Sequence, residues 1–472
     1  MKSLIMLLIG FGLSVPAAAQ SFVADGDQVQ LNTVTTGEQV SPRAACDSEG
    51  AHVVVWQSES SPDTDNSGTS ILARSFGADG KPVAPEFQVN AYILGYQILP
   101  SIAMRSTGQF VVVWGSDSSV GTDSFYSIEA RLFSADAIPL GDEFQVNTVE
   151  NNIQEFPAVA MAGDGKFLIV WQSVGSPEDD SDGRSIQGQL FSADGSSSGT
   201  QFQVNTYTTG DQADPEVVAL PGGDFVVTWF NVSGSAGNDD SGRSVQGQVV
   251  SAAGLLLGGE FQVNTYTEGH QSNSAIAVDG AGNFIIAWTS EGSSGSDDGY
   301  CILAQRYDAD ALAISAEFQV NDYTTGIQAM SSVAAWENGD FLLSWRSGEY
   351  DGGGPDGDSW GIATRLFSSD GNPVDGEFVA NNETTGRQSQ PDVLRLNHGA
   401  RIVWQSESSS GGDGDQSIQG RGFVLSIFSD DFETGDSDRW EVVVPGGQKG
   451  FVSGILPGWD PEFPGRMERY NR

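Results

Sequence analysis

The chain has 472 residues and a formal net charge of −42, from 63 acidic and 21 basic residues. Nucleic-acid binders need basic patches, and anionic membrane surfaces attract basic segments, so this charge balance excludes both as partners. It favours divalent cations, cationic partners or a high-salt environment, where self-repulsion is screened.

The first 19 residues are typical of a secretory signal peptide. Lys2 supplies the positive start, Leu4–Val15 the apolar segment and Ala17–Ala19 the small-residue cleavage site. The apolar run is too short to span a bilayer comfortably, and no Cys follows it. We therefore expect a secreted chain, extracellular or periplasmic, with no membrane span.

From about residue 22 to residue 423 the sequence repeats a unit of 57 to 60 residues. Each unit has an Asn, a Gln seven residues later, and a Trp 24 residues later, or 23 in the last copy. The Asn residues are Asn32, Asn90, Asn147, Asn205, Asn264, Asn321 and Asn381, and the Trp residues are Trp56, Trp114, Trp171, Trp229, Trp288, Trp345 and Trp404. Markers in phase over seven copies define seven structural units.

Each unit predicts four short strands. In the third copy we expect them at Pro157–Met161, Phe167–Trp171, Ser185–Phe191 and Phe202–Asn205, because these runs are β-branched or aromatic and are bounded by turn residues. No part of the mature chain has sustained helical periodicity. Four antiparallel strands per unit, repeated radially, predict an all-β fold, a seven-bladed β-propeller. The alternative is a β-solenoid.

The two ends of the repeat region complement each other. Val29–Asn32 is a fourth strand with no blade before it, and Ser417–Phe423 is a third strand that lacks its fourth. We expect these two strands to pair, which would complete the last blade and close the ring. The predicted domains are a signal peptide at 1–19, the propeller at 20–428 and a C-terminal appendage at 429–472.

The chain has only two cysteines. Cys46 falls in the first strand of blade one, and Cys301 falls in the third strand of blade five. A disulfide needs Cα atoms within about 7 Å, and these blades are not neighbours in a seven-membered ring. We therefore predict two buried thiols that form no disulfide.

Acidic residues gather in the loops between the second and third strands, which emerge on one face of an up-and-down propeller. This face is predicted to carry a ring of carboxylates. Two of the loops resemble calcium loops: Asp63 and Asp65 precede Gly68, and Asp180 and Asp182 precede Gly183. Oxygen-rich loops of this kind suit Ca²⁺, which is the predicted cofactor. The alternative is that these are ordinary polar turns exposed to solvent.

The repeated Asn, Gln and Trp are interpreted as structural: the amides satisfy backbone groups between blades, and the Trp rings pack between them. Residues that differ between copies are the better candidates for ligand binding. Just before the third strand stand Tyr126, Tyr300 and Trp360, and blade six adds Arg346 and Tyr350. Aromatic faces beside carboxylates suit a sugar. The alternative is that these aromatic rings cover the neighbouring blade.

Catalytic residues are not evident in the sequence. The three histidines, His52, His270 and His398, occupy different repeat positions and form no metal-spaced or triad-like cluster. Paired carboxylates occur throughout the chain and single out no site. We therefore predict no catalytic residue.

The repeat text W-Q-S, then an Asp/Gly/Ser loop, S-I-Q-G-Q-x-F-x-A-D-G and E-F-Q-V-N-T-Y-T-T-G-x-Q resembles a repeat of large secreted bacterial proteins. These are described as calcium-binding or haemolysin-type surface proteins, and the resemblance covers residues 22–423. It implies a secreted, propeller-like protein at the cell surface and, from the name of that group, calcium. Residues 427–440 resemble a C-terminal IFxDGFExGxxxxW element of secreted proteobacterial proteins, with Asp431 where Gly is usual.

These patterns together predict a secreted or cell-surface, non-enzymatic binding module. Its acidic face would take a glycan or a protein ligand in a calcium-dependent way, and we expect a monomer. One alternative is a hydrolase or lyase on a propeller scaffold, which would need acid, base and Arg residues from different copies to converge near the axis. The other alternative is a structural envelope protein.

Overall fold

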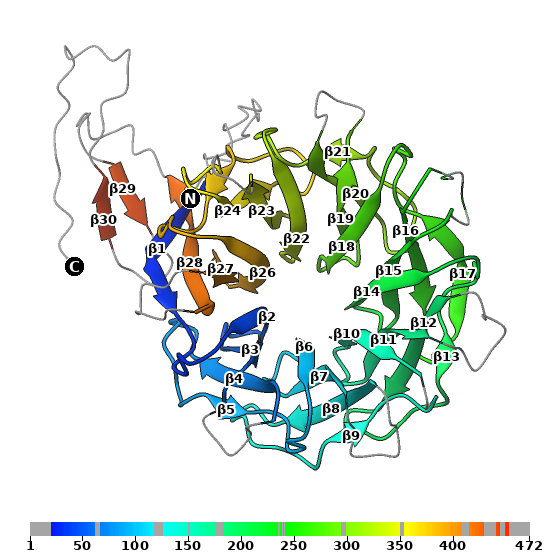
Figure 1. The fold of residues 1–472 in the computed structure, drawn as a ribbon. Helices are drawn as coiled ribbons and strands as arrows, with labels where there is room; N and C mark the ends of the chain where they lie inside the picture. The colour runs from blue at the N-terminus through cyan, green and yellow to red at the C-terminus, as the bar shows by residue number, and fades with distance from the viewer. Residues whose placement is uncertain are drawn as a thin grey trace, which may run out of the picture. The chain divides into compact units, whose positions relative to one another are not determined.

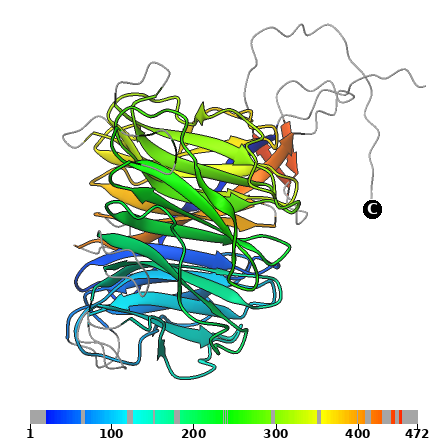
Figure 2. The same cartoon turned by 90° about the vertical axis from the view of Figure 1, so that its right-hand side faces the viewer.

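The computed structural model describes residues 20–61, 67–117, 126–149, 152–174, 183–234, 237, 239, 241–293, 299–349, 354–397, 399–407, 415–428, 440–443 and 449–452. Within these ranges the strands form seven antiparallel sheets arranged in a ring (Figure 1). The prediction of an all-β, seven-bladed propeller is therefore confirmed. Figure 2 shows the strands of the near blades running from one face of the ring to the other.

The innermost strand of each blade begins at or next to the repeated Gln and surrounds the ring axis in Figure 1. These strands are β2 (Gln39–Cys46), β6 (Gln97–Met104), β10 (Gln154–Met161), β14 (Gln212–Ala219), β18 (Gln271–Val278), β22 (Ile327–Ala335) and β26 (Gln388–Leu396). The second strands carry the repeated Trp and are β3 (His52–Ser58), β7 (Phe110–Ser116), β11 (Phe167–Val174), β15 (Phe225–Asn231), β19 (Phe284–Glu291), β23 (Phe341–Gly348) and β27 (Gly399–Ser406).

The third strands lie further from the axis and are β4 (Ser70–Phe76), β8 (Ser127–Phe133), β12 (Arg184–Phe191), β16 (Ser244–Val250), β20 (Tyr300–Tyr307), β24 (Trp360–Phe367) and β28 (Ser417–Phe428). The fourth strands are β5 (Phe87–Gln88), β9 (Phe144–Gln145), β13 (Phe202–Gln203), β17 (Leu256–Gln262), β21 (Phe318–Gln319) and β25 (Phe378–Val379). Most of these are two residues long, shorter than predicted from the sequence.

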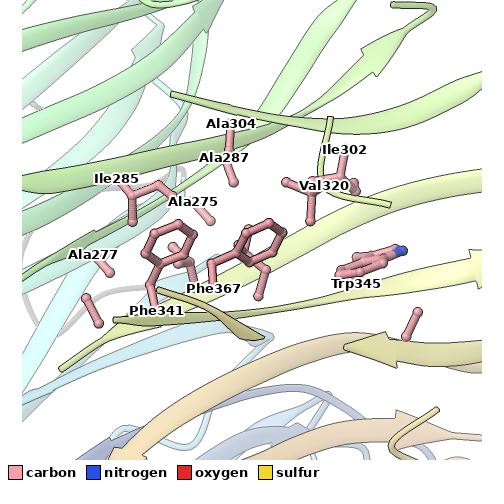
Figure 3. Close-up of a cluster of buried hydrophobic side chains, with 14 residues drawn as sticks. Ala275, Ala277, Ile285, Ala287, Ile302, Ala304, Val320, Phe341, Trp345 and Phe367 are labelled. Carbon is pink, nitrogen blue, oxygen red and sulfur yellow. The ribbon is translucent and has the colours of Figure 1, made fainter. Parts of the chain in front are cut away.

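The hydrophobic core lies between adjacent blades, because each sheet is apolar on both faces. Figure 3 shows one such layer, in which Phe341, Phe367 and Trp345 of blade six pack against Ile285 and Ala275 of blade five. All seven repeated Trp are almost completely buried, which confirms their predicted packing role. A second ring stack recurs within the blades, where Phe341 and Phe367 lie 5.2 Å apart and nearly parallel.

The repeated Asn is a hydrogen-bonding clamp in all seven copies. Its side-chain oxygen accepts the backbone N–H of the third strand, as from Ile186 to Asn205 at 2.7 Å, and its amide nitrogen donates to the carbonyl two residues later, at Tyr207. The same amide donates to the repeated Gln212 at 3.0 Å. Buried amides that satisfy the backbone where the chain crosses between blades are what the sequence predicted.

The predicted closure of the ring is confirmed. β1 (Gln20–Gln30) pairs with β28, and the backbone N–H of Leu31 donates to the carbonyl of Ile418 at 2.8 Å. Ile418 in turn donates its N–H to the Asn32 side chain at 2.9 Å, which reproduces the clamp of the other blades. Gln28 accepts backbone N–H groups from the crossing at Asn382, as Glu86 does for the crossing at Thr33.

Every innermost strand is interrupted by a bulge, and this bulge sets the geometry at the axis. In β14 the pairing with β15 shifts between Ala213 and Glu216. The first bulged residue has a positive φ of 50° to 56° in all seven blades, although none is Gly; they are Ser41, Leu99, Phe156, Asp214, Asn273, Met330 and Gln390. Bulges redirect side chains, and here the first bulged residue of every blade lies at the axis. Two positions later, Arg43, Ser101 and Glu216 also lie there.

The two cysteines form no disulfide, as predicted. Cys301 is buried and Cys46 is only partly buried.

No helix that could cross a membrane occurs in the described ranges. A second compact unit consists of residues 1–23 and 425–472, in which β29 (Trp440–Val443) pairs antiparallel with β30 (Lys449–Val452). The predicted signal peptide at 1–19 lies outside the described residues.

A test of the closure compares two apolar residues at the start of the chain. Leu31 is 1% exposed and packs with Val403 and Ile418 of blade seven, whereas Val29 is 47% exposed. We expect Leu31→Ala to lower the free energy of unfolding by about 2–5 kcal/mol, because it leaves a cavity at the joint of the ring. Val29→Ala is the control, with an expected change within about 0.5 kcal/mol. Equal denaturant midpoints for the two variants would contradict the closure.

Candidate axial site

A cavity of about 480 Å³ lies at the ring axis on the side of blades three to five. Its volume is in the range of small-ligand sites. Its charged lining residues are Arg43, Arg184, Asp211, Asp214, Glu216 and Arg243, and its other lining residues include Phe156, Gln172, Phe230, Asn273 and Ser274. The innermost strands and the loops just before the third strands supply most of them.

The charged residues at the axis are departures from the repeat. Eleven residues after the repeated Asn, the seven blades carry Arg43, Ser101, Ala158, Glu216, Ala275, Ser332 and Asp392. Arg43 and Glu216 line the axial cavity from this position and Asp392 faces Arg43, whereas Ala158 and Ala275 pack into the cores between blades. The two-residue spacing of Asp214 and Glu216 on β14 brings a second carboxylate of the same blade into the cavity.

An ion pair crosses the axis. Nη2 of Arg43 in blade one lies 3.4 Å from Oε1 of Glu216 in blade four, 173 residues away in the sequence. Asp392 of blade seven also faces this guanidinium; it accepts the backbone N–H of Ala44 at 2.7 Å and the Ser332 hydroxyl at 3.0 Å. The axis therefore joins side chains from blades on opposite sides of the ring.

Asp214 is held by two neighbouring blades. Its side chain accepts a hydrogen bond from the amide of Asn273 in blade five at 3.0 Å. Its backbone N–H donates to Oε1 of Gln172 in blade three at 3.2 Å. These contacts fix the carboxylate in the cavity lining and support its unusual φ of 56°.

The charges in this cluster do not balance, because one guanidinium faces three carboxylates. Burial raises the pKa of Glu216 to about 7; Arg43 opposes this rise, while Asp214 and Asp392 add to it. Burial likewise raises the pKa of Asp214 and of Asp392, and Arg43 opposes both rises. Burial alone would lower the pKa of Arg43, but the three carboxylates outweigh burial and leave it raised. Glu216 therefore exchanges a proton near neutral pH.

Two further arginines line the cavity at the position just before the third strand. Arg184 places Nη1 3.4 Å from Oδ2 of Asp211. Arg243 places its guanidinium carbon 4.9 Å from the centre of the Phe230 ring. The backbone N–H of Arg243 donates to Nδ1 of His270 at 3.2 Å. The cavity thus combines a proton-exchanging carboxylate, a second carboxylate, cationic groups and aromatic surface, which are the elements of acid–base catalysis on a polar substrate.

The ligand residues predicted from the sequence lie elsewhere. Trp360 stacks against Arg346 at 4.0 Å and against Arg387 at 5.3 Å, measured from guanidinium carbon to ring centre. Tyr126 is half-buried, Tyr300 is 37% exposed, and neither lines the axial cavity. Tyr350 lies outside the described residues. Ligand binding by this group of residues stays a prediction for a surface separate from the cavity.

The calcium prediction rests on loops that the structure does not describe, since Asp63, Asp65, Asp180 and Asp182 are all outside the described residues. The same applies to much of the predicted acidic face. In the part of the chain that is described, no group of three or more His, Cys, Asp or Glu residues could hold a metal ion. Calcium binding therefore stays a prediction.

His52 has a structural role. It replaces the Phe of blades two to six, stacks on Phe76 with ring centres 5.2 Å apart, and is almost fully buried. Burial, with a smaller contribution from the charge of Arg401, lowers its pKa to about 4, so the ring is neutral at physiological pH. His398 lies outside the described residues.

Arg43, Asp214, Glu216 and Arg243 were not among the site residues predicted from the sequence. Aligning the copies eleven residues after the repeated Asn would have revealed Arg43 and Glu216 as departures from Ser and Ala. Asp214 stands nine residues after the repeated Asn, at a position that differs in every copy. Because a regular strand alternates its faces, the repeat pattern offered no reason to place those positions at the axis. The bulge supplies that reason, and its non-Gly residues with positive φ carry no sequence signature.

No family model and no curated protein matches this sequence. Solved structures match over most of the chain at low identity. A protein of unknown function from Dyadobacter fermentans DSM 18053 is 10% identical, with 86% of this chain and 99% of that chain covered and a TM-score of 0.47. The GH93 α-L-arabinofuranosidase of Fusarium graminearum is 11% identical over 85% and 98%, with a TM-score of 0.44. The polysaccharide lyase Uly1 is 7% identical over 85% and 100%, with a TM-score of 0.49.

The predicted function as a non-enzymatic binding module was wrong. The matching structures that stand against it include an arabinofuranosidase, an arabinanase and polysaccharide lyases, all of which are enzymes, and their likeness to this chain is one of fold. At these identities the matches transfer no residue roles, so the chemistry is derived from this chain alone. Within the chain, Arg43, Asp214 and Glu216 meet the condition set for an enzyme, because acid, base and Arg residues from different blades converge at the axis.

A test of the cluster measures how stability depends on pH. The folded protein keeps the Glu216 proton up to a pKa of about 7, whereas the unfolded chain releases it near 4.5. Between these values the folded state binds more protons, so this group lowers stability as pH rises, and its stabilising effect is lost above the folded pKa. We expect the melting temperature of the wild type, relative to that of Glu216→Gln, to fall as pH rises through this window.

The matched control for this measurement is Glu38→Gln, since Glu38 is exposed and does not line the cavity. Its pH profile is expected to follow that of the wild type. A Glu216→Gln profile parallel to the wild type would mean that Glu216 titrates in the folded protein as it does in the unfolded chain.

Proposed function

We propose that this protein is a hydrolase or lyase that cleaves a glycosidic bond in the axial cavity, with Glu216 as the residue that gives or takes the proton. The observation that carries the proposal is the Arg43–Glu216 pair across the axis, beside Asp214, which leaves a carboxyl group with a pKa of about 7 in a cavity of small-ligand size. Acid–base catalysis is most effective when the pKa of the group lies near the working pH.

A carbohydrate substrate is supported by the lining of the cavity. Phe156 and Phe230 offer apolar surface for the face of a sugar ring, while Gln172, Asn273 and Ser274 offer hydrogen-bonding groups for hydroxyls. The open axis of a propeller also gives a long chain access to the cavity mouth. An exported, propeller-borne enzyme acting on an external glycan is consistent with the signal peptide predicted at 1–19.

The two reaction types use the same residues differently. In hydrolysis, Glu216 would protonate the leaving glycosidic oxygen while Asp214 accepts a proton from the water that attacks the anomeric carbon. In elimination, a carboxylate would take the proton next to a sugar carboxylate, the bond to the leaving oxygen would break, and that oxygen would be protonated. In elimination, Arg43 would stabilise the negative charge that develops on the sugar when the proton is removed. In hydrolysis, the charge that develops on the sugar ring is positive, and a carboxylate such as Asp214 would stabilise it.

The test is a panel of neutral, uronate-containing and sulfated polysaccharides incubated with the purified protein. New reducing ends report cleavage, and ultraviolet absorbance of an unsaturated product distinguishes a lyase from a hydrolase. We expect at least one substrate to be cleaved and Glu216→Gln to lower kcat by about 10²- to 10⁴-fold.

Glu38→Gln serves again as the control and is expected to keep full activity. Far-ultraviolet circular dichroism establishes that both variants are folded. Undiminished cleavage by Glu216→Gln would remove this residue from catalysis, and a panel without any cleavage would remove the enzymatic function.

A further inference from the structure

The position just before the third strand carries a different side chain in almost every blade. Its occupants are Thr69, Tyr126, Arg184, Arg243, Tyr300, Trp360 and Gln416. Arg occurs only in blades three and four, and both of these arginines line the axial cavity. The two arginines therefore lie in adjacent blades, and both are placed at the same side of the cavity.

Arg184 and Arg243 differ in how their charge is compensated. Arg184 pairs with Asp211 at 3.4 Å. Arg243 is exposed, and no carboxylate among the described residues lies within ion-pairing distance of it. The Arg243 guanidinium thus lines the cavity with no carboxylate of the described residues in direct contact, which leaves it available to a negatively charged ligand group.

Phe230 supports this arginine. The Arg243 guanidinium lies over its ring at 4.9 Å, and both residues line the cavity. Phe230 follows the repeated Trp, at a position where Gln57, Gln172 and Gln405 instead accept a backbone N–H from the bulge of the next blade. In blade four, therefore, Phe230 stands where these blades have a Gln that bonds to the backbone, and its ring lies under the Arg243 guanidinium. Stacking orients the planar group and leaves its N–H edge available for an oxyanion.

We infer that Arg243, on its Phe230 platform, forms a subsite for a negatively charged substituent of the substrate, either a sugar carboxylate or a sulfate ester. Both groups present paired oxygens that match the two N–H donors of a guanidinium edge. The identity of the ligand as a glycan rests on the proposed function, whereas the charge of the ligand rests on Arg243 alone. Of the remaining cavity charges, Arg43 faces Glu216 and Arg184 faces Asp211. Asp214 accepts from Asn273, and the charge of Arg243 acts to lower its pKa.

The test measures binding without turnover, by titration calorimetry on the Glu216→Gln protein. The carboxylate probes are tetragalacturonate and its methyl ester, in which the carboxylates are neutralised. The sulfate probes are a carrageenan tetrasaccharide and the same tetrasaccharide after desulfation. We expect at least one charged probe to bind more tightly than its neutral partner, with an affinity that falls as salt is added.

The second arm adds Arg243→Gln and Arg243→Lys. Loss of a charge-assisted pair is expected to weaken binding of the charged probe by about 10- to 100-fold in Arg243→Gln, with a smaller loss in Arg243→Lys, which keeps the charge without the planar edge. Neither variant is expected to alter binding of the neutral partner. Lys81→Gln, which removes one positive charge at a site 80% exposed on blade one, is the control and is expected to bind as the parent does.

The outcomes separate this inference from the proposed function. Charged probes that bind no better than their neutral partners, or an Arg243→Gln protein that binds as the parent does, would overturn the anionic subsite even if a polysaccharide is cleaved. Charge-selective binding that depends on Arg243 would uphold it even if the wild type cleaves nothing in the panel, because the calorimetry does not depend on turnover.

Discussion

The side-chain amide of the Asn that ends each blade is the interaction on which the rest of the structure depends. It accepts from the third strand of its own blade and donates to the chain that crosses to the next blade. Thin sheets of four short strands would leave these backbone groups without partners inside the protein, which costs more than a single hydrogen bond gains. The same clamp closes the ring, since Asn32 binds Ile418 as the other copies bind their third strands.

The Asn clamps and the apolar layers between blades hold the ring together. The innermost strands, in addition, supply the residues at the axis. Their bulges interrupt the pairing at the same place in every blade and direct the first bulged residue towards the axis. The Asn clamp and the Trp layer do not involve that residue. The seven copies can therefore keep one scaffold while they differ at the axis, which is a general way in which a repeated fold acquires a single site.

The charges at the axis are compatible with a stable fold because the three carboxylates surround one guanidinium and one of them keeps a proton. Three carboxylates around one guanidinium would be strongly unfavourable if all were ionised, and the rise in the pKa of Glu216 to about 7 relieves the repulsion by keeping a proton. Arg43 and Glu216 keep 42% and 34% of their side-chain surface accessible within the cavity, so water as well as the pairing lowers the cost of burial. The arrangement that makes the cluster tolerable also makes it reactive near neutral pH.

The sequence by itself determined the scaffold. The phase of Asn, Gln and Trp set the number of blades and the order of strands, the unmatched ends predicted the closure by β1 and β28, and blade positions excluded a disulfide between Cys46 and Cys301. These features follow from local patterns and their period. The position of His52 in the Phe register likewise separated it from the other two histidines.

Only the tertiary structure decided the site. Arg43 and Glu216 are 173 residues apart, and they meet because blades one and four face each other across the axis. The bulge that directs them inward forms at Ser41 and Asp214, residues that carry no mark of a positive φ, since the neighbouring blades hold them there. Local sequence pattern specifies which residues form strands. Side chains from distant blades meet at the axis only because the seven blades close into a ring.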